Sequence, residues 1–359
     1  MVVISCVQIS YLLLLLSRFV TSYLFVLFSV VDEYGFERHE DFDYESYEDF
    51  MSVYLKVLAT RAQKWSVLLG EGKSVKRTNT IKRYVRKGVP SEHRPSVWMA
   101  ISEAEKMKEQ CPDLFHKILD GPFEKELVDL VKTDLPRTFP DNIYFTKEAN
   151  HQTHLFHILI AYAHNNRTVG YCQGLNYIAG LLLLATKSEE TSFWLLKVLV
   201  EKILPDYYTK TMDGLIVDIE VLSELVKSKV PDVHQHVINL GLPWAVITTK
   251  WFVCLFAEVL PIETVLRIWD CLFYEGSKIL FRVCLTLIKS NRATILACND
   301  FTSLAECFKA IVKNASALHC HEFMQSIFKV PGTLSNATIA KLRARFAKQR
   351  REQQRKEPR

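Results

Sequence analysis

The chain has 359 residues, of which 49% are hydrophobic and 24% are charged, a balance that excludes disorder throughout the chain and predicts a folded core. Its formal net charge is +5, but nine Lys and Arg against two Glu lie in residues 341–359, so this tail carries +7 and the remainder sums to −2. A broadly basic face that binds nucleic acid is therefore excluded.

Nine cysteines stand singly along the chain, mostly inside apolar stretches, and no C-x-x-C pair is present. This usage is typical of reduced thiols in a cytosolic protein. His151, His154 and His157 recur every three residues, but such positions drift around a helix and do not predict a metal site. The G-x-x-x-x-G-K-[ST] phosphate loop is absent, so we expect no metal and no cofactor of the chain's own.

Residues 1–31 are apolar almost throughout, and Arg18 is their only charge before Asp32. Arg18 divides them into two runs, each shorter than the roughly 20 residues that span a bilayer, and an Arg in mid-span costs about 2.5 kcal/mol or more. A secretory signal fits poorly, because no basic segment precedes the apolar run and no small-x-small cleavage site closes it. We expect an alternative or mis-assigned start outside the working domain, and a membrane anchor is the less favoured alternative.

The next stretch, residues 32–80, is predicted to be a helical preface followed by a linker. Apolar and aromatic residues recur at helical spacing from Phe42 to Leu69, which predicts an amphipathic helix or helix pair. The polar stretch 71–80 then predicts a boundary. We expect the main domain to occupy residues 81–314, and a helical extension with the basic tail to occupy residues 315–359.

Beyond Ile81, segments with one apolar face alternate with Pro, Gly or short polar clusters, and each segment predicts a helix. These segments are 94–108, 123–133, 148–164, 173–186, 191–204, 213–228, 244–260, 263–274, 279–296, 301–313 and 335 onward. The period-two alternation of strands is absent, and no repeat of fixed length occurs. We therefore predict an all-α, two-lobed domain rather than a regular helical solenoid.

The first of two irregular polar stretches between these helices is 131–140, with the sequence VKTDLPRTFP. Pro136 removes a backbone donor and biases the residue before it away from helix, so the chain should leave its helix near Asp134 and present Arg137 on a stiffened turn. Asp134 lies three residues before Arg137 and can hold its guanidinium. Alone, these residues favour a surface ion pair at a helix end, and a phosphate-binding arginine is the alternative.

The second irregular stretch is 169–174, with the sequence VGYCQG. Gly170 and Gly174 permit positive φ or close backbone approach on both sides, so the amide of Gln173 should project. A glutamine amide has both a donor and an acceptor, which positioning a water for attack on phosphorus requires. A glutamine that caps a buried helix start is an equally supported interpretation of this stretch alone.

Together these stretches resemble the TBC domain family, the helical activators of Rab GTPases. The opening signature of that family is similar to Arg86-Lys87-Gly88-Val89-Pro90 followed by Arg94 and Trp98. Its I-x-x-D-x-x-R motif resembles Val131, Asp134 and Arg137, and its Y-x-Q-G-M-N motif resembles Tyr171-Cys172-Gln173-Gly174-Leu175-Asn176. A later block of the family, L-P-x-E…R-x-W-D-x-x-F, resembles Leu260-Pro261, Arg267-Ile268-Trp269-Asp270 and Phe273.

The resemblance covers roughly residues 82–314, and residues 34–69 also resemble the segment that precedes the domain in part of the family. Val131 replaces the usual isoleucine and Leu175 the usual methionine, and both are apolar exchanges that leave the chemistry intact. Large aromatic side chains and paired charges in helices are more often structural, so we assign four further motif residues to the fold: Arg94, Trp98, Trp269 and Asp270.

The resemblance implies that the chain is not an enzyme by itself but a GTPase-activating protein for a GTP-loaded Rab-family GTPase. Arg137 would stabilise charge on the transferred phosphate, and Gln173 would orient the attacking water. The implied supporting residues, which orient Arg137 or shape the glutamine loop, are Asp134, Tyr171, Gly174 and Asn176. GTP and magnesium would belong to the partner, and we expect a cytoplasmic protein with transient peripheral association with the membranes that carry Rab proteins.

Two other classes of function remain as alternatives. A non-catalytic Rab-binding or adaptor module would share the fold without accelerating hydrolysis, and a membrane-anchored adaptor would depend on residues 1–31. The intact set of Asp134, Arg137 and Gln173 favours the activator. For the basic tail, a solvated helical extension is favoured over a membrane or RNA tether.

Overall fold

The computed structural model describes residues 30–38, 40, 42–70, 75–146, 149–313 and 319–356. Within these ranges the regular secondary structure is helical, and two isolated β-bridges occur but no strand, so the prediction of an all-α fold is confirmed. No helix in the described ranges is both long and apolar enough to cross a membrane. Residues 1–29, on which the anchor alternative depends, lie outside these ranges.

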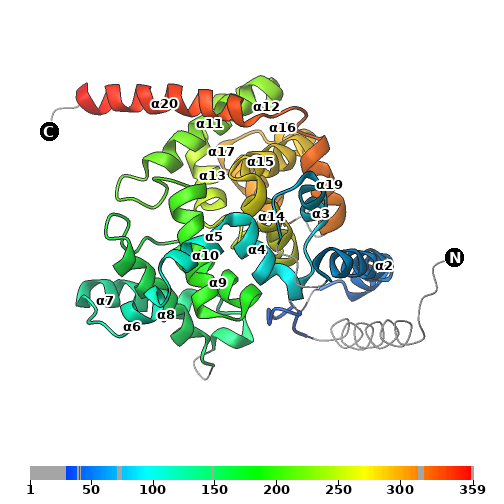
Figure 1. Ribbon diagram of the computed structural model, residues 1–359. Coiled ribbons are helices and arrows are strands. Elements are labelled where there is room, and N and C mark those ends of the chain that lie inside the picture. The colour runs from blue at the N-terminus through cyan, green and yellow to red at the C-terminus, as the bar shows by residue number, and fades with distance from the viewer. Residues whose placement is uncertain are drawn as a thin grey trace.

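The first lobe is built around α8, α9 and α10, which pack against one another (Figure 1). The α-helices of this half are α2 (Tyr44–Leu69), α3 (Asn79–Lys87), α4 (Arg94–Ser102), α5 (Ala104–Gln110), α6 (Leu114–Leu119), α7 (Lys125–Asp134), α8 (His151–Asn165), α9 (Leu175–Thr186) and α10 (Glu189–Val198). Between or after them lie three 3₁₀ turns and one π-helical turn: η2 (Ser91–His93), η3 (Leu135–Arg137), η4 (Ile143–Phe145) and η5 (Leu199–Ile203).

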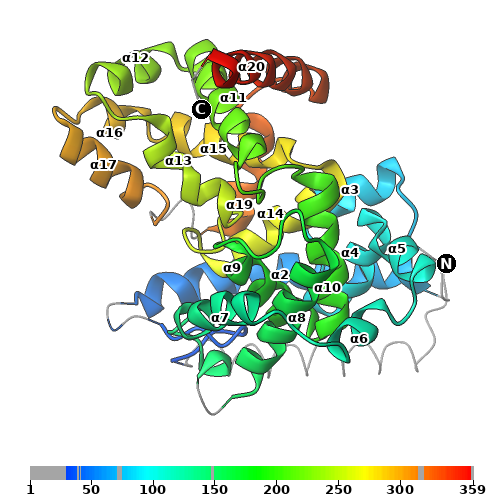
Figure 2. The same ribbon diagram turned by 90° about the vertical axis from the view of Figure 1, so that its left-hand side faces the viewer.

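The second lobe is built around α11, which packs against α12, α13 and α20 (Figure 2). Its helices are α11 (Asp213–Lys229), α12 (Pro231–Asn239), α13 (Trp244–Val253), α14 (Ile262–Glu275), α15 (Lys278–Ser290), α16 (Arg292–Leu296), α17 (Phe301–Ala310), α19 (Cys320–Lys329) and α20 (Asn336–Lys356). Helix α14 contacts α3 and α4 on one side and α15 and α19 on the other, so it joins the lobes.

The structure interrupts or shortens several of the predicted helices. The predicted helix 279–296 is α15 followed by α16, with Asn291 between them. The predicted helix 94–108 is α4 followed by α5, because Glu103 adopts a left-handed conformation with φ of 67° between them. The predicted helix 244–260 ends at Val253, because Leu255 and Phe256 adopt left-handed φ values of 48° and 65°. Helices α3, α6 and α12 were not predicted, since each is short and buries only one or two residues. Helix α19 lies within the segment predicted as a helical extension, and it buries four residues at helical spacing: Cys320, Phe323, Met324 and Ile327.

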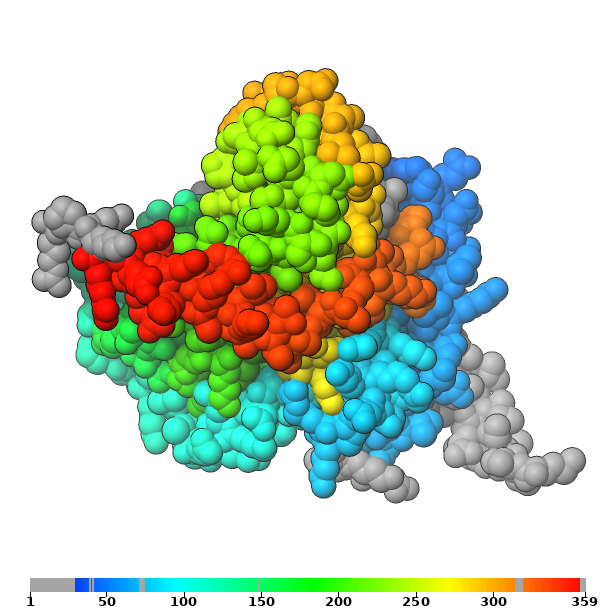
Figure 3. All heavy atoms as spheres, turned by 90° about the horizontal axis from the view of Figure 1, so that it is seen from above, coloured from blue at the N-terminus to red at the C-terminus, as the bar shows by residue number. Residues whose placement is uncertain are grey.

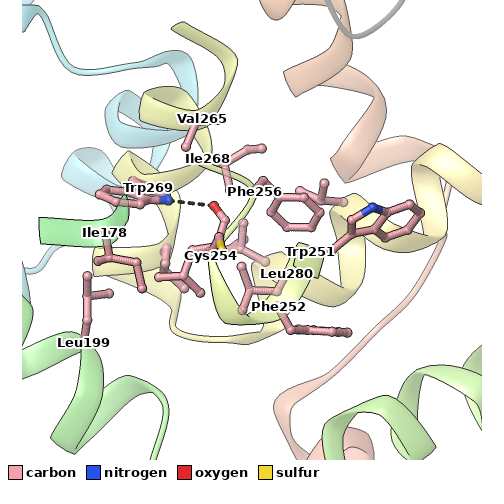
Figure 4. Packing of buried hydrophobic residues seen from close by; sticks show 14 of the residues in the cluster. Ile178, Leu199, Trp251, Phe252, Cys254, Phe256, Val265, Ile268, Trp269 and Leu280 are labelled. Carbon is pink, nitrogen blue, oxygen red and sulfur yellow. Dashed lines mark hydrogen bonds between the residues drawn. The ribbon is translucent and has the colours of Figure 1, made fainter. Parts of the chain in front are cut away.

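The motif residues assigned to the fold lie in the core, as predicted. Trp98 Nε1 donates to the Asp270 carboxylate at 2.8 Å, and the Arg94 guanidinium lies 3.4 Å from the same carboxylate. Trp269 is fully buried and its Nε1 donates to the carbonyl of Leu255 at 3.0 Å, within the cluster shown in Figure 4. This bond holds the left-handed turn that follows α13.

The helical preface packs into the same core as the lobes. Trp65 is fully buried, and its Nε1 donates to the Gly88 carbonyl at 2.9 Å. Arg267 of α14 donates to the Tyr54 hydroxyl of α2 at 3.2 Å. Helix α2 therefore contributes to the support of α14.

The C-terminal helix α20 lies along the second lobe, beside α11 (Figure 3). Arg343 donates to both carboxylate oxygens of Asp218 at 2.6 Å and to the Ser277 hydroxyl at 2.8 Å. Asp218 is buried, so this part of the basic tail is fixed by an ion pair of low exposure.

Candidate functional site

The arginine turn, residues 134–138, follows α7. Helix α7 ends at Asp134, and the 3₁₀ turn η3 that follows has Pro136 at its second position, where proline is compatible with the backbone. As the spacing predicts, the guanidinium of Arg137 forms an ion pair with the Asp134 carboxylate. The side chain of Asp134 is 4% exposed and that of Arg137 is 49% exposed. A buried carboxylate thus holds an arginine that remains open to solvent.

The glutamine turn, residues 171–174, precedes α9. Gln173 is exposed, whereas Gly174 is buried and has φ of 105°. A Cβ on Gly174 would lie 2.3 Å from Cγ1 of Val253 at the end of α13, so only glycine fits this position without movement. Val253 of the second lobe therefore sets how closely the glutamine turn of the first lobe can approach it.

Three hydrogen bonds join the arginine turn to the glutamine turn and to the start of α9, which follows it directly. The Tyr171 hydroxyl donates to the Asp134 carboxylate, Asn176 Nδ2 donates to the Thr138 hydroxyl at 2.8 Å, and the Tyr177 hydroxyl donates to the Arg137 carbonyl at 3.3 Å. The two turns are separated by more than 30 residues of sequence, yet these bonds make them one unit.

Further hydrogen bonds stabilise the conformation of each turn. The backbone N–H of Gly174 donates to the Asn176 side chain at 3.0 Å, so Asn176 holds both turns at once. The Thr138 hydroxyl donates to the Asp134 carbonyl at 2.7 Å and accepts from Asn176. Asn176 and Thr138 are fully buried, where unmade bonds would be costly.

Burial keeps the hydroxyl and thiol groups of the glutamine turn in their neutral forms. Burial and the hydrogen bond to Asp134 raise the pKa of Tyr171 well above its ordinary value. Burial also raises the pKa of the Cys172 thiol, next to Gln173. Tyr171 is therefore a stable hydrogen-bond donor to Asp134 at physiological pH.

The structure brings together all six residues singled out from the sequence, and it adds three that were missed: Thr138, Tyr177 and Val253. Thr138 and Tyr177 directly follow residues of the two motifs, and this adjacency was the only signal available for them. Val253 had none, because an apolar residue on a helix is ordinary until its neighbour is known.

Two of the three histidines considered as metal ligands, His154 and His157, pair with one carboxylate, that of Glu189. Glu189 at the start of α10 lies 2.8 Å from His157 Nδ1 and 3.5 Å from His154 Nε2, both on α8. Within the part of the chain that the structure describes, no group of three or more His, Cys, Asp or Glu side chains could hold a metal ion.

Comparisons with known proteins agree with this architecture. Residues 91–296 match the model of the Rab-GTPase-TBC domain. Growth hormone-regulated TBC protein 1-A of Danio rerio is 53% identical over 315 residues, which cover 87% of this chain and 88% of that protein. Growth hormone-regulated TBC protein 1 of Homo sapiens is also 53% identical, over 87% of this chain and 94% of that protein.

Among solved structures, the crystal structure of the Chlamydomonas flagellar RabGAP TBC domain superimposes with a TM-score of 0.74. It is 32% identical, and the match covers 84% of this chain and all of that one. Because the family model matches more than half of the chain and the relatives match nearly all of it, the chain belongs to the Rab-GTPase-TBC domain family.

Proposed function

We propose that the chain is a GTPase-activating protein that supplies Arg137 and Gln173 in trans to a GTP-loaded Rab-family GTPase. Two observations carry this proposal together. The side chains of Arg137 and Gln173 are both exposed, and hydrogen bonds donated by Tyr171, Asn176 and Tyr177 hold the arginine turn against the segment that carries Gln173. Membership of the Rab-GTPase-TBC family and similarity to a solved RabGAP domain supply the class of partner.

Arg137 is the proposed charge-stabilising residue. As the bond to the γ-phosphate breaks, negative charge spreads over its oxygens and the bridging oxygen, and a guanidinium placed there lowers the barrier. Such arginines accelerate hydrolysis by roughly 10³ to 10⁵, which corresponds to about 4–7 kcal/mol. The ion pair with Asp134 reduces the rotamer freedom that Arg137 loses when it engages phosphate.

Gln173 is the proposed water-orienting residue. Its amide can accept a hydrogen bond from the attacking water and donate one to a phosphate oxygen. The turn holds Gln173 outward, because Gly174 behind it packs directly on Val253. GTP and magnesium enter with the partner, so the chain is a complete catalyst only in the complex.

The supporting residues have separate proposed roles. Tyr171 and Asp134 orient the arginine, and Asn176 fixes its distance from the glutamine by bonding both turns. Gly174 permits the close packing of the glutamine turn on α13. None of these groups has to touch the nucleotide to fulfil its role.

The test is phosphate release from a panel of GTP-loaded Rab proteins, with wild type, Arg137→Ala and Gln173→Ala. We expect wild type to accelerate at least one Rab protein and both variants to lose that acceleration while remaining folded. Arg167→Ala is the matched control, since Arg167 is an exposed arginine that pairs with Glu124 and precedes the glutamine turn in sequence. A folded wild type that binds a GTP-loaded Rab protein without accelerating any would favour the non-catalytic binding module instead.

A further inference from the structure

One segment of the second lobe, residues 253–258, contacts the glutamine turn and also Tyr177 of α9, which bonds the arginine turn. Val253 packs against Gly174, the residue that follows Gln173. At the other end of the segment, Glu258 lies beside the Tyr177 hydroxyl on α9. The Trp269 indole holds the segment through the Leu255 carbonyl, so its position is determined by the core.

Tyr177 contacts the arginine turn and Phe139, the residue that follows it. Its hydroxyl donates to the carbonyl of Arg137 at 3.3 Å, and its ring packs edge-on against Phe139, with centroids 5.5 Å apart. Phe139 has φ of 51°, which is strained for a bulky residue and persists only where its surroundings hold it. Gly180, one turn further along α9, leaves room for the Phe139 ring, since a Cβ there would lie 3.0 Å from it.

Two charged side chains of the second lobe, Lys250 and Glu258, lie near Tyr177. Lys250 of α13 pairs with Glu258 at 2.6 Å, which fixes the carboxylate. Burial and the nearby Glu258 carboxylate raise the pKa of Tyr177 to about 12, so its hydroxyl stays protonated and able to donate. The remaining neighbours of Tyr177 with charge or titratable character are Cys254 and Arg137.

We propose that Tyr177 is a positioning residue that fixes the backbone of the arginine turn through its hydrogen bond to the Arg137 carbonyl. This inference rests on the proposed function, because the position of Arg137 matters only if Arg137 acts on the partner. Tyr171 holds the side chain of the arginine through Asp134, whereas Tyr177 holds its main chain. The two tyrosines flank Gln173, so a displacement of either turn is transmitted to the other.

The test compares Tyr177→Phe with wild type in Rab GTP hydrolysis. The phenylalanine keeps the ring contact with Phe139 and removes only the hydroxyl. We expect kcat of stimulated hydrolysis to fall about five- to tenfold, with KM unchanged, because a hydrogen bond that places a transition-state group is lost. Urea unfolding should give nearly the same free energy of unfolding for Tyr177→Phe and wild type, which a general loss of stability would not produce.

A matched control variant sharpens the result. Tyr144→Phe is the matched control, because Tyr144 is a partly exposed tyrosine whose hydroxyl bonds no described residue. Unchanged kcat in Tyr177→Phe, or a change in KM alone, would overturn the inference while leaving the proposed function in place.

A second measurement does not depend on the partner. The amide of Thr138 donates to the Leu135 carbonyl inside η3 at 3.1 Å, and its hydrogen exchange reports the order of the arginine turn. We expect faster exchange at Thr138 in Tyr177→Phe than in wild type or Tyr144→Phe. Equal exchange in all three proteins would contradict the positioning role even if no Rab protein responded to wild type.

Discussion

The Tyr171 hydroxyl donates a hydrogen bond to one oxygen of the Asp134 carboxylate, while the other oxygen of that carboxylate pairs with the Arg137 guanidinium. Tyr171 belongs to the glutamine turn and Asp134 to the arginine turn. The two residues lie 37 positions apart in sequence. A single buried carboxylate therefore sets the position of one proposed catalytic side chain relative to the loop that carries the other.

Replacement of Asp134 by asparagine should weaken activation without abolishing it. Asparagine can still accept from Tyr171, but it removes the charge that holds Arg137, and the freed arginine must be ordered during catalysis. We expect a fall in stimulated kcat of about tenfold, smaller than that of Arg137→Ala. Asp129→Asn, one turn earlier on the exposed face of α7, should leave the rate unchanged. Equal losses in Asp134→Asn and Arg137→Ala would show that the carboxylate does more than orient the arginine.

Alanine at Gly174 should destabilise the protein and displace the glutamine turn. The added Cβ would meet Val253 at 2.3 Å and would hold φ of 105°, so we expect a loss of about 1–3 kcal/mol in urea unfolding and a clear loss of activation. Gly170→Ala is the control in the same loop, because φ is 62° there but the nearest atom is 3.9 Å away. Val253→Ala should partly restore Gly174→Ala, and its failure to do so would mean that φ strain alone is responsible.

Loss of the Trp269 indole hydrogen bond should destabilise residues 253–258, which contact Gly174 and Tyr177. Trp269→Phe leaves the buried carbonyl of Leu255 without its donor, which we expect to cost about 1–3 kcal/mol beyond the loss of ring volume. Trp244→Phe removes a similar ring volume at a position where Nε1 is buried without a hydrogen-bond partner among the described residues. Similar unfolding free energies for the two variants would argue against a role of this bond.

Glu275 at the end of α14 should contribute stability that depends on pH. Burial opposes its ionisation, but Arg86, Lys82 and Lys278 hold the pKa of Glu275 below its ordinary value of 4.5. A carboxyl whose pKa is lower in the folded state stabilises the protein above pH 4.5, and this contribution is lost as pH falls through the folded pKa.

The corresponding experiment is urea unfolding of Glu275→Gln and wild type across about pH 3 to pH 7. Wild type should be the more stable protein near pH 7, and the difference should shrink towards pH 3. Glu306→Gln, whose side chain is 64% exposed and pairs with Lys309 on the surface, should differ little from wild type at any pH. A difference for Glu275→Gln that stayed constant with pH would exclude this carboxylate as the titrating group.

Local sequence was sufficient to predict the all-α class, most of the long helices and the ion pair between Asp134 and Arg137. Each of these depends on residues within one or two turns of helix, where the period of 3.6 and the proline at position 136 act directly. Prediction was wrong where one residue changes the backbone conformation inside an apolar stretch, as at Glu103 and at Leu255. Apolar periodicity continues across such a residue, so it carries no signal of the break.

Only the tertiary structure decided how the two turns meet. The bonds from Tyr171 to Asp134 and from Asn176 to Thr138 join residues 37 and 38 positions apart, and the contact of Gly174 with Val253 joins residues of different lobes. No local pattern specifies such pairs, because their distance depends on how α7, α8, α9 and α13 pack together. The sequence thus determined which groups each turn presents, and the packing of the helices determined that hydrogen bonds join the two turns.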